Sequence, residues 1–277
     1  MSVVTTGFFD GVHLGHRHVL DSLVSSARER GEEAIVVTFW PHPRTVLQQD
    51  ARDFRILTSL EEKKALLLAA GADRVEVLPF TRSFAALTAT EYLQLLKDRF
   101  GASLVVMGYD NRIGSDKLSA NEIDNVLVVD EIGDSTLSST KIRKALERGD
   151  IETANAMLGY PYQLYGVVVA GNRLGRTIGF PTANMQLYEP LKLVPGNGVY
   201  AVEVEVLGAC YKGMCNIGTR PTVGGTVRTI ETHILDFNED IYGLPLRLHF
   251  LRRIRDERKF PSLEALQAQL QKDSLQV

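Results

Sequence analysis

The chain has 277 residues, of which 44% are hydrophobic and 23% charged, and its formal net charge is −3 at pH 7. This is the composition of a globular protein of one large or two ordinary domains. It argues against a dedicated nucleic-acid binder, which needs a concentrated basic surface. No apolar run reaches the ~20 residues of a membrane span, and no secretory signal is present. We therefore expect a cytoplasmic protein with no nucleic-acid or membrane partner, whose oligomeric state the sequence does not indicate.

The first half of the chain alternates apolar runs with helical patterns. Apolar runs of continuous character, separated by helices, are typical of a parallel sheet that is covered on both faces. Only the segment 111–125 connects Asp110 to the last expected strand, so the crossover helix there is expected to be abbreviated. The expected strands are 3–6, 34–39, 74–78, 104–107 and 126–129, and the expected helices include 60–70, 90–100 and 138–148.

A glycine-containing turn, Gly7–His16, follows the first expected strand and opens a helical pattern. Backbone N–H groups and the helix dipole favour anions at such a place. His13 and His16 are three residues apart and can reach one phosphate chain, and Gly15 removes a side chain where a ligand must come close. A histidine pair of this kind also occurs as a surface or capping feature. The strand before it and the helix after it favour the functional interpretation, and the motif resembles the H-x-G-H signature of the nucleotidylyltransferase superfamily.

A second motif, S-S-T-K-I-R, begins at Ser138 and opens another helix. A capped surface helix explains it, but Arg143 lies where the helix dipole disfavours a cation unless an anion is bound. The family that the first motif resembles carries an S-S-T-x-x-R stretch at this point in its order of motifs. In that family the stretch holds the triphosphate. We assign to His13, His16 and Arg143 the stabilisation of the negative charge in the transition state and on the leaving group. Asp10 and Asp110 are weaker candidates for a metal or ribose contact, and a turn role is equally favoured. The expected ATP contacts are Gly7, Phe8, Phe9, Asp10, Gly15, Gly108, Asp110, Ser138, Ser139 and Thr140.

The second half changes to a period of two, as where Val202, Val204 and Val206 alternate with glutamates. This pattern, with turns rich in glycine, proline and asparagine, predicts a closed or nearly closed antiparallel barrel of about six strands. A helix is expected near the end. We place the boundary so that residues 1–158 and 159–277 form the two domains. The recognisable strands are 165–170, 198–207, 211–217, 229–235 and 244–250, and the helix is 263–270.

Two features of the second half suggest chemistry. The stretch 171–184 has three glycines and two arginines and forms a plausible phosphate loop. Thr182 and Asn184 are two apart, so in extended backbone their oxygen atoms point the same way and suit Mg²⁺; a proline-led turn is the alternative. Glu231 shares a strand face with His233 and could act as a general base. Spacing alone favours a solvent-facing charge paired with Arg228.

The motifs taken in order carry a family resemblance. G-R-T-I-G-F-P-T-A-N, G-V-Y-A-V, N-I-G-T-R-P-T and E-T-H-I-L-D-F resemble riboflavin kinases. With G-F-F-D-G-V-H-L-G-H, T-F-W-P-H-P, G-Y-D and S-S-T-K-I-R before them, nearly the whole chain resembles the bifunctional prokaryotic FAD synthetases. The resemblance implies a Rossmann-like nucleotidylyltransferase domain with a parallel sheet, then a six-stranded riboflavin kinase barrel with a C-terminal helix. It implies that Glu231 is the kinase base and that Thr182 and Asn184 bind Mg²⁺-ATP, with Gly171, Gly175, Arg176 and Gly179 as further ATP contacts.

The expected function is the synthesis of FMN from riboflavin and ATP, and then of FAD from FMN and ATP. One alternative is a chain with a single competent domain, the kinase. Another is a flavin-binding carrier without turnover, which would not require the histidines, Arg143 and Glu231 together. An RNA-binding barrel is disfavoured by the charge and by the lack of interleaved aromatic and basic residues.

Overall fold

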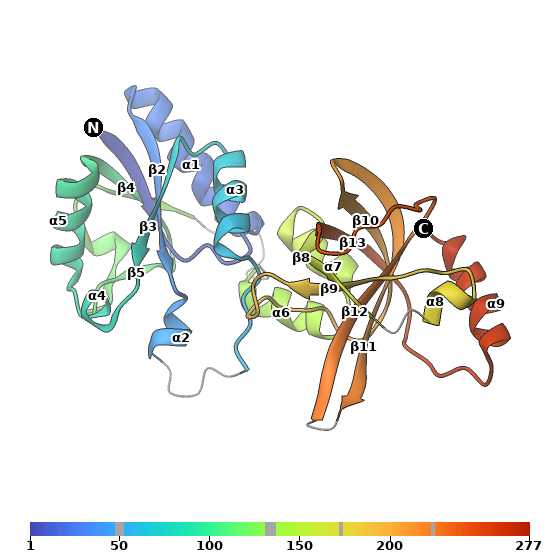
Figure 1. Cartoon of the computed structure of the whole chain (residues 1–277). Helices are drawn as coiled ribbons and strands as arrows, with labels where there is room; N and C mark the ends of the chain where they lie inside the picture. The colour runs from blue at the N-terminus through green and yellow to red at the C-terminus, as the bar shows by residue number, and fades with distance from the viewer. Residues whose placement is uncertain (48–52, 131–136, 172–173, 223–224) are drawn as a thin grey trace. The chain divides into compact units, whose positions relative to one another are not determined.

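The computed structural model describes residues 1–47, 53–130, 137–171, 174–222 and 225–277. The chain divides into two compact units, Met1–Ser139 and Thr140–Val277 (Figure 1). Each unit has its own sheet and its own core, so each is described by itself. Within the described ranges, no helix is both long enough and apolar enough to cross a membrane.

The first unit is built on five parallel strands in the order β3-β2-β1-β4-β7. The strands form because their apolar runs are buried: Val3 and Val4 of β1 have no exposed surface. The parallel sheet predicted from the sequence is thereby confirmed. The strands are β1 (Ser2–Thr6), β2 (Glu33–Trp40), β3 (Arg74–Pro79), β4 (Ala102–Gly108) and β7 (Val126–Val129).

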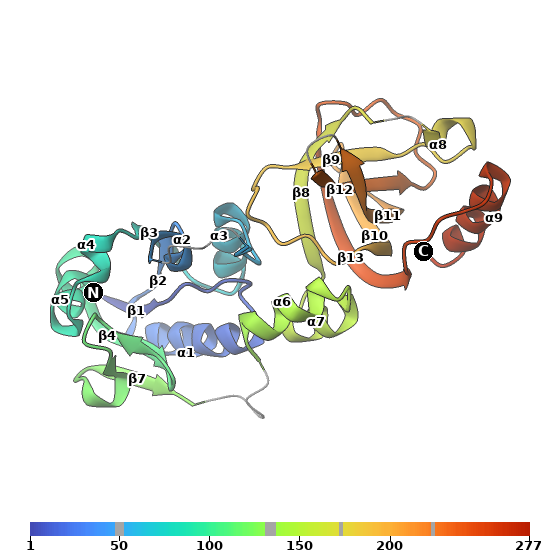
Figure 2. The same ribbon diagram turned by 90° about the horizontal axis from the view of Figure 1, so that it is seen from below.

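Helices cover both faces of this sheet (Figure 2). α1 (Leu14–Arg30) and α3 (Leu60–Ala69) pack on one face, where Leu20 and Leu67 are fully buried. α5 (Ala89–Phe100) packs on the other face, where its Leu96 is fully buried. The short helices α2 (Pro43–Leu47) and α4 (Arg82–Ala85) were not predicted. The carboxyl ends of the strands are left to the loops, which is where α/β sheets of this kind bind ligands.

The crossover between β4 and β7, whose residues are all described, contains no α-helix. It consists of a hairpin, β5 (Arg112–Ile113) and β6 (Leu118–Ser119), and one 3₁₀ turn, η1 (Ala120–Glu122). Gly114 has φ +77°, and a Cβ placed on it would lie 2.2 Å from the backbone nitrogen of Ala89. The hairpin therefore sits directly on the start of α5, where Asp116 accepts a hydrogen bond from the Ala89 N–H. The helix expected here is reduced further than the sequence predicted.

The second unit is a closed antiparallel barrel with strand order β10-β11-β12-β9-β8-β13, followed by the helix α9 (Leu263–Ser274). The alternation of Val202, Val204 and Val206 places these side chains inside, where they are buried. The six-stranded barrel and its C-terminal helix are confirmed; β9 is the strand that we did not list. The strands are β8 (Tyr162–Val169), β9 (Ala183–Leu187), β10 (Gly198–Val206), β11 (Ala209–Thr222), β12 (Gly225–Ile234) and β13 (Pro245–Arg255).

Two helices before the barrel, α6 (Ser139–Glu147) and α7 (Ile151–Leu158), belong to the second unit from Thr140 onward. The Asn155 side chain donates to the carbonyl of Phe250 and accepts from the N–H of Tyr162, both at 2.8 Å. Arg253 donates to the carbonyl of Arg148 at 3.0 Å. By contacts the chain therefore divides after Ser139, whereas the change in sequence period placed the boundary after residue 158.

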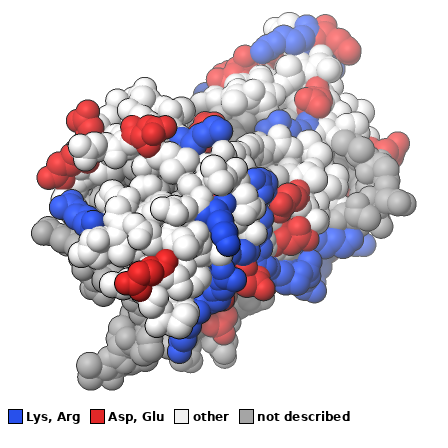
Figure 3. Space-filling view, turned by 90° about the vertical axis from the view of Figure 1, so that its right-hand side faces the viewer, with Lys and Arg blue, Asp and Glu red and all other residues white. Residues whose placement is uncertain are grey.

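Basic side chains are accompanied by acidic ones in both units. On the face drawn in Figure 3, Lys and Arg gather in a band with Asp and Glu beside them. In the barrel unit, Arg255 pairs with the buried Asp273 at 2.8 Å and Arg247 pairs with Glu205 at 3.4 Å. This intermixing fits the small net charge of the chain.

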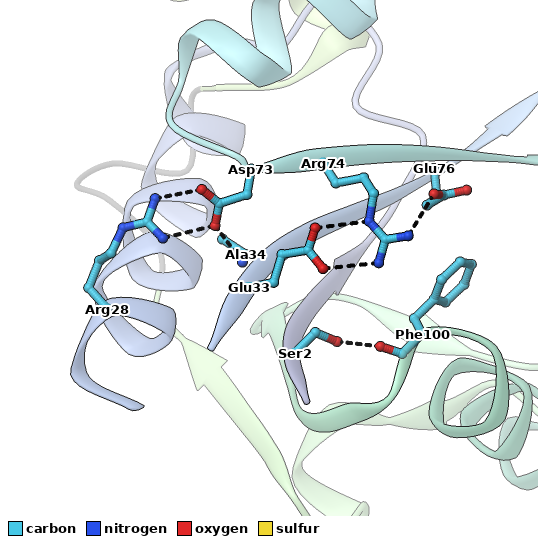
Figure 4. Close-up of polar contacts among 8 residues, drawn as sticks. All are labelled: Ser2, Arg28, Glu33, Ala34, Asp73, Arg74, Glu76 and Phe100. Carbon is cyan, nitrogen blue, oxygen red and sulfur yellow. Dashed lines mark hydrogen bonds and ion pairs between the residues drawn. The ribbon is translucent and has the colours of Figure 1, made fainter. Parts of the chain in front are cut away.

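Ion pairs also join α1 to the start of β3, and β3 to β2, at one edge of the parallel sheet (Figure 4). Asp73 accepts two hydrogen bonds from Arg28, each of 2.8 Å, and one from the N–H of Ala34. Arg74 donates to Glu33 and Glu76 on neighbouring strands. The hydrogen bonds from Arg28 hold the pKa of Asp73 down at about 2, below its usual 3.8. The ionised carboxylate therefore stabilises the fold above about pH 4, and this stabilisation is lost as the pH falls towards 2.

Substitution Asp73→Asn is expected to lower the free energy of unfolding at pH 7, measured by urea titration, by only about 0.2–1 kcal/mol, because the pair is partly exposed and screened. The difference from the unmodified chain should shrink steadily between pH 4 and pH 2. Asp21→Asn, on the exposed side of α1, is the matched control and should leave the midpoint unchanged. An equal effect of Asp73→Asn at pH 2 and pH 7 would contradict the assignment of this stabilisation to the carboxylate.

Candidate active sites

The loop between β1 and α1 carries the first candidate site. It lies at the carboxyl end of β1 and has an unusual backbone: Phe9 and Val12 have φ of 47° and 37°, and Gly11 has φ 85°. Left-handed conformations of non-glycine residues are costly and gather at ligand-binding loops. Both side chains are buried, Phe9 at 5% exposure and Val12 at none. The loop is therefore held in a strained shape by its surroundings.

Asp10 is the main anchor of this loop. Its buried carboxylate accepts hydrogen bonds from the backbone N–H groups of Leu57 (2.9 Å) and Thr58 (3.1 Å). The Thr58 hydroxyl in turn accepts from the N–H of Gly11 at 3.1 Å. A carboxylate engaged in this way serves the loop itself. These bonds favour the structural role over the metal or ribose contact that we considered for Asp10.

The two histidines lie against each other at the start of α1. His13 is the N-cap residue, and its Nδ1 accepts a hydrogen bond from the N–H of His16 at 3.4 Å. The rings stack with centroids 3.7 Å apart, and Phe9 meets His16 edge-on at 5.3 Å. A Cβ on Gly15 would lie 3.3 Å from the His13 ring, so this glycine makes room for the histidine. The two histidines therefore lie side by side, and their reach to one phosphate chain stays a prediction.

His16 is a neutral imidazole at pH 7. Burial, followed by the neighbouring His13 and Lys63, lowers its pKa well below the usual 6.5. Its buried Nδ1 has no hydrogen-bond partner among the described residues, so a second ring proton would have no acceptor there. A neutral His16 ring can donate a hydrogen bond to an anion but carries no full positive charge.

The other residues predicted for this site lie in several places. The Ser139 hydroxyl donates to the carbonyl of Asp10 at 2.9 Å, which ties the start of α6 to the histidine loop. Thr140 and Arg143 follow on the same helix but belong to the second unit. Gly7 and Phe8 begin the histidine loop, Gly108 ends β4, the exposed Asp110 follows it, and Ser138 directly precedes α6.

The second candidate site lies on three neighbouring strands of the barrel. Glu231 of β12 is directly opposite Asn184 of β9 on one side and Asn216 of β11 on the other. Directly opposed residues of an antiparallel pair share a face, with Cβ atoms about 5 Å apart. Because Ile230 and Thr232 are buried inside the barrel, this row of amide, carboxylate and amide lies outside it. Arg228 is on the opposite side of the pleat, where it donates to backbone carbonyls and Asn197, so pleating does not pair it with Glu231.

A pocket of about 480 Å³ lies beside β9 and β12, and its lining includes Ala183 and Thr232, the chain neighbours of Asn184 and Glu231 on the other side of the pleat. Thr182 and Arg176 line it, together with Asn238, Asp240 and Tyr242 from the loop after β12. A hydroxyl, a guanidinium and a half-open cavity suit a polyphosphate ligand.

The glycines of the stretch 171–180 allow close packing beside this pocket. A Cβ on Gly171 would lie 2.2 Å from the Asn184 amide nitrogen, and one on Gly175 would lie 2.1 Å from the carbonyl oxygen of Phe180. Gly179 has φ +79° and follows the single-turn helix α8 (Leu174–Thr177). Asn172 and Arg173 lie outside the described residues.

Comparisons with known proteins agree with this geometry. Residues 1–142 match the family model described as FAD synthetase, and residues 158–277 match the one described as riboflavin kinase. A bifunctional riboflavin kinase/FMN adenylyltransferase of Bacillus subtilis is 38% identical over 98% of this chain and 90% of the relative. The protein of that description from Escherichia coli K12 is 39% identical, over 99% of this chain and 90% of the relative.

The chain belongs to the bifunctional riboflavin kinase/FMN adenylyltransferase family. The resemblance inferred from the motifs is confirmed. A crystal structure described as a macrolide-efflux protein from Streptococcus pneumoniae has the same fold, with a TM-score of 0.93 and 36% identity over 99% of this chain and 92% of that one.

Two residues that lie next to the predicted site residues were not singled out from the sequence. Lys63 of α3 is only 4% exposed, although the E-E-K-K stretch looks like a solvated helix face. The sequence feature that could have predicted its burial is its position four residues before the fully buried Leu67, on the apolar face of the helix. Asn216 was one polar residue among alternating apolar ones, and only the register with Glu231 places it in the site.

Substitution Gly171→Ala tests the close approach of the glycine loop to Asn184. The added Cβ overlaps the amide and must displace it, so we expect riboflavin phosphorylation to fall by about 10- to 100-fold in kcat/KM, as a misplacement near 1 Å does. Adenylylation of added FMN by the same preparation should be unchanged and serves as the internal control. Wild-type phosphorylation by Gly171→Ala would show that the Asn184 position is unimportant.

Proposed function

We propose that this chain phosphorylates riboflavin to FMN in its second unit and adenylylates FMN to FAD in its first unit, with ATP as co-substrate of both steps. The observation that carries the proposal is the row in which Glu231 stands between Asn184 and Asn216, on strands of which two, β9 and β12, also line a pocket of about 480 Å³. The strained histidine loop of the first unit supports the second activity. Membership of the bifunctional family agrees with both.

The kinase step needs a base and a positioned phosphate. The Glu231 carboxylate would accept the proton of the ribityl 5′-hydroxyl as its oxygen forms a bond to the γ-phosphorus of ATP and the bond to the β-phosphate oxygen breaks. The products are FMN and ADP. Arg176 lines the pocket and would stabilise the phosphate charge. Asn184 and Asn216 flank the base on both sides and would orient it or the hydroxyl.

Magnesium fits the donors of this second site. The Thr182 hydroxyl and the Asn184 amide offer hard oxygen atoms, and Mg²⁺ in nucleotide sites uses one or two protein ligands along with phosphates and waters. The Asn184 amide packs directly on Gly171, whose lack of a side chain allows the amide to lie there. Bound there, the ion would neutralise phosphate charge. We therefore assign Thr182 and Asn184 to Mg²⁺-ATP.

The adenylyl step requires no residue as a nucleophile. An FMN phosphate oxygen forms a bond to the α-phosphorus of ATP, the α–β bond breaks, and pyrophosphate leaves. The loop residues 7–13 and the start of α1 would bind the phosphates through backbone N–H groups, and His13 and His16 would donate to the charge that develops. Arg143 and the hydroxyls of Ser138, Ser139 and Thr140 are assigned to the triphosphate.

The proposal is tested by incubating the chain with riboflavin, ATP and Mg²⁺ and resolving the flavins by chromatography. FMN and then FAD should accumulate. Absence of FMN would contradict the kinase assignment, and FMN without FAD would leave the chain with one competent unit. Binding of flavin with neither product would favour a carrier.

We also propose that these substrates place the protein in the cytoplasm, where ATP is made and used. Riboflavin, FMN, FAD and ATP are then its partners, and neither nucleic acid nor a membrane is required by the chemistry. Cell fractionation with detection of the chain by antibody tests the location; recovery with the membrane fraction would contradict it.

A further inference from the structure

Lys63 is a buried cation at the edge of the histidine loop. Its Nζ donates to the carbonyl of Phe8 at 3.1 Å and to the carbonyl of Phe39 at 3.4 Å. The Trp40 ring lies 5.8 Å away, and the side chain is only 4% exposed. Phe8 is the second residue after β1, and Phe39 is the next-to-last residue of β2. One ammonium thus joins the ends of two central strands to α3.

The segment that carries Lys63 also holds the rest of the loop. The N–H groups of Leu57 and Thr58 bind the Asp10 carboxylate, and the Thr58 hydroxyl accepts from Gly11. Phe8, Asp10 and Gly11 are therefore all bound from outside the loop. The left-handed Phe9 lies between them and the left-handed Val12 follows them, and both conformations are costly, so these bonds help to hold the loop in its shape.

Packing alone does not explain a lysine here. A methionine would fill nearly the same volume without the free-energy cost of burying a charge. The two carbonyls satisfy two of the three ammonium donors, and Asp10 is the nearby anion that favours the charged form. A cation retained at this cost, beside a loop that would bind phosphates, points to a functional reason.

We propose that Lys63 is a positioning residue for adenylyl transfer: its buried ammonium ties Phe8 and Phe39 together, fixes the turn that carries His13 and His16, and supplies a positive potential beside them. The inference rests on the proposed adenylyl transfer at this loop. It assigns a role to a residue outside every motif that identified the site.

The charged groups that face His16 are His13 in the same loop and Lys63 on α3, and both lower its pKa, with Lys63 the smaller contributor after burial and His13. Asp10 is the anion close to Lys63. Removal of the lysine charge must therefore raise the His16 pKa, because one repulsion of the imidazolium form disappears. A side chain that acts by packing alone would not produce this shift.

The test compares Lys63→Met with Lys64→Met in the full chain. Lys64 is the next residue of α3 and is partly exposed, so it is a matched control. Lys63→Met should lower kcat for FAD formation from FMN by about 10- to 100-fold and leave riboflavin phosphorylation unchanged. Its His16 ring signals, followed by NMR, should titrate at a higher pH than those of the unmodified chain. Lys64→Met should do neither.

The unmodified chain provides a test that does not depend on a foldable variant. Burial lowers the pKa of Lys63 to about 8. The ammonium is therefore charged below pH 8 and is lost as the pH rises through this value. FAD formation should decline there, and Lys63→Arg, which stays charged, should remove the decline. The proposal is overturned if Lys63→Met forms FAD as fast as Lys64→Met does. It is also overturned if the decline above pH 8 persists in Lys63→Arg. If the unmodified chain forms no FAD at all, the proposed function is overturned instead.

Discussion

Substitution Glu231→Gln should nearly abolish FMN formation while FMN added to the same protein is still converted to FAD. The amide keeps the size of the carboxylate but cannot take the proton of the ribityl hydroxyl, and loss of a general base costs about 10²–10⁴-fold. A glutamine fits between Asn184 and Asn216 because it is nearly the size of the glutamate, and both neighbours are themselves amides. The expected loss is therefore in kcat and not in folding.

The control for this substitution is Glu203→Gln. Glu203 is an exposed glutamate on β10 of the same barrel, opposite Lys212, and lies away from the pocket. It should leave both products unchanged. If Glu231→Gln stopped FAD formation from FMN as well, in a protein with an unaltered melting profile, the assignment of the two reactions to two units would be wrong. If FMN still formed at the normal rate, Glu231 would not be the base.

The fold was largely accessible from the sequence because its elements are governed by local patterns. β2 is apolar at residues 34–37, Phe39 and Trp40, and β10 alternates from Val202 to Val206, so the period distinguishes a covered parallel strand from a half-exposed barrel strand. β9 was missed because its sequence, Ala-Asn-Met-Gln-Leu, is short and is stabilised by its partners β8 and β12. The hairpin at 112–119 likewise depends on docking against α5.

The boundary between the two units could not be predicted from the change in sequence period alone. The period changes near residue 158, but α6 and α7 pack on the barrel through Asn155 and Arg253. A change of pattern marks where one kind of structure stops. It does not tell which neighbour an amphipathic helix covers, since both units offer apolar surface.

The site could be predicted as a set of motifs but not as a set of contacts. His13, Asn184 and Glu231 were found because their neighbours form recognisable patterns. Asp10 belongs to such a pattern, yet its carboxylate is bound to Leu57 and Thr58, which are 47 and 48 residues away in sequence. Lys63 belongs to none. Long-range hydrogen bonds of this kind depend on the folded geometry, which no local spacing encodes.

Substitution His16→Ala should reduce FAD formation from FMN by about 10²–10³-fold and leave riboflavin phosphorylation unchanged. The neutral imidazole would act by donating an N–H to the phosphate charge that develops, and removal of one such preorganised donor has effects of this size. His18→Ala, two residues further along α1, is the matched control and should be nearly silent, because its imidazole is outside the stacked pair.

The protonation state of His16 leads to a second test of this prediction, a comparison of His16→Gln with His16→Ala. Because burial keeps the ring neutral, its contribution is a hydrogen bond and not a full charge. His16→Gln, whose amide also donates, should therefore retain more FAD synthesis than His16→Ala. If the histidine acted as a cation, both substitutions would be equally damaging, and the rate of the unmodified chain would rise as the pH falls towards the histidine pKa. A flat rate between pH 6 and pH 7, together with partial rescue by glutamine, is the result that the neutral ring requires.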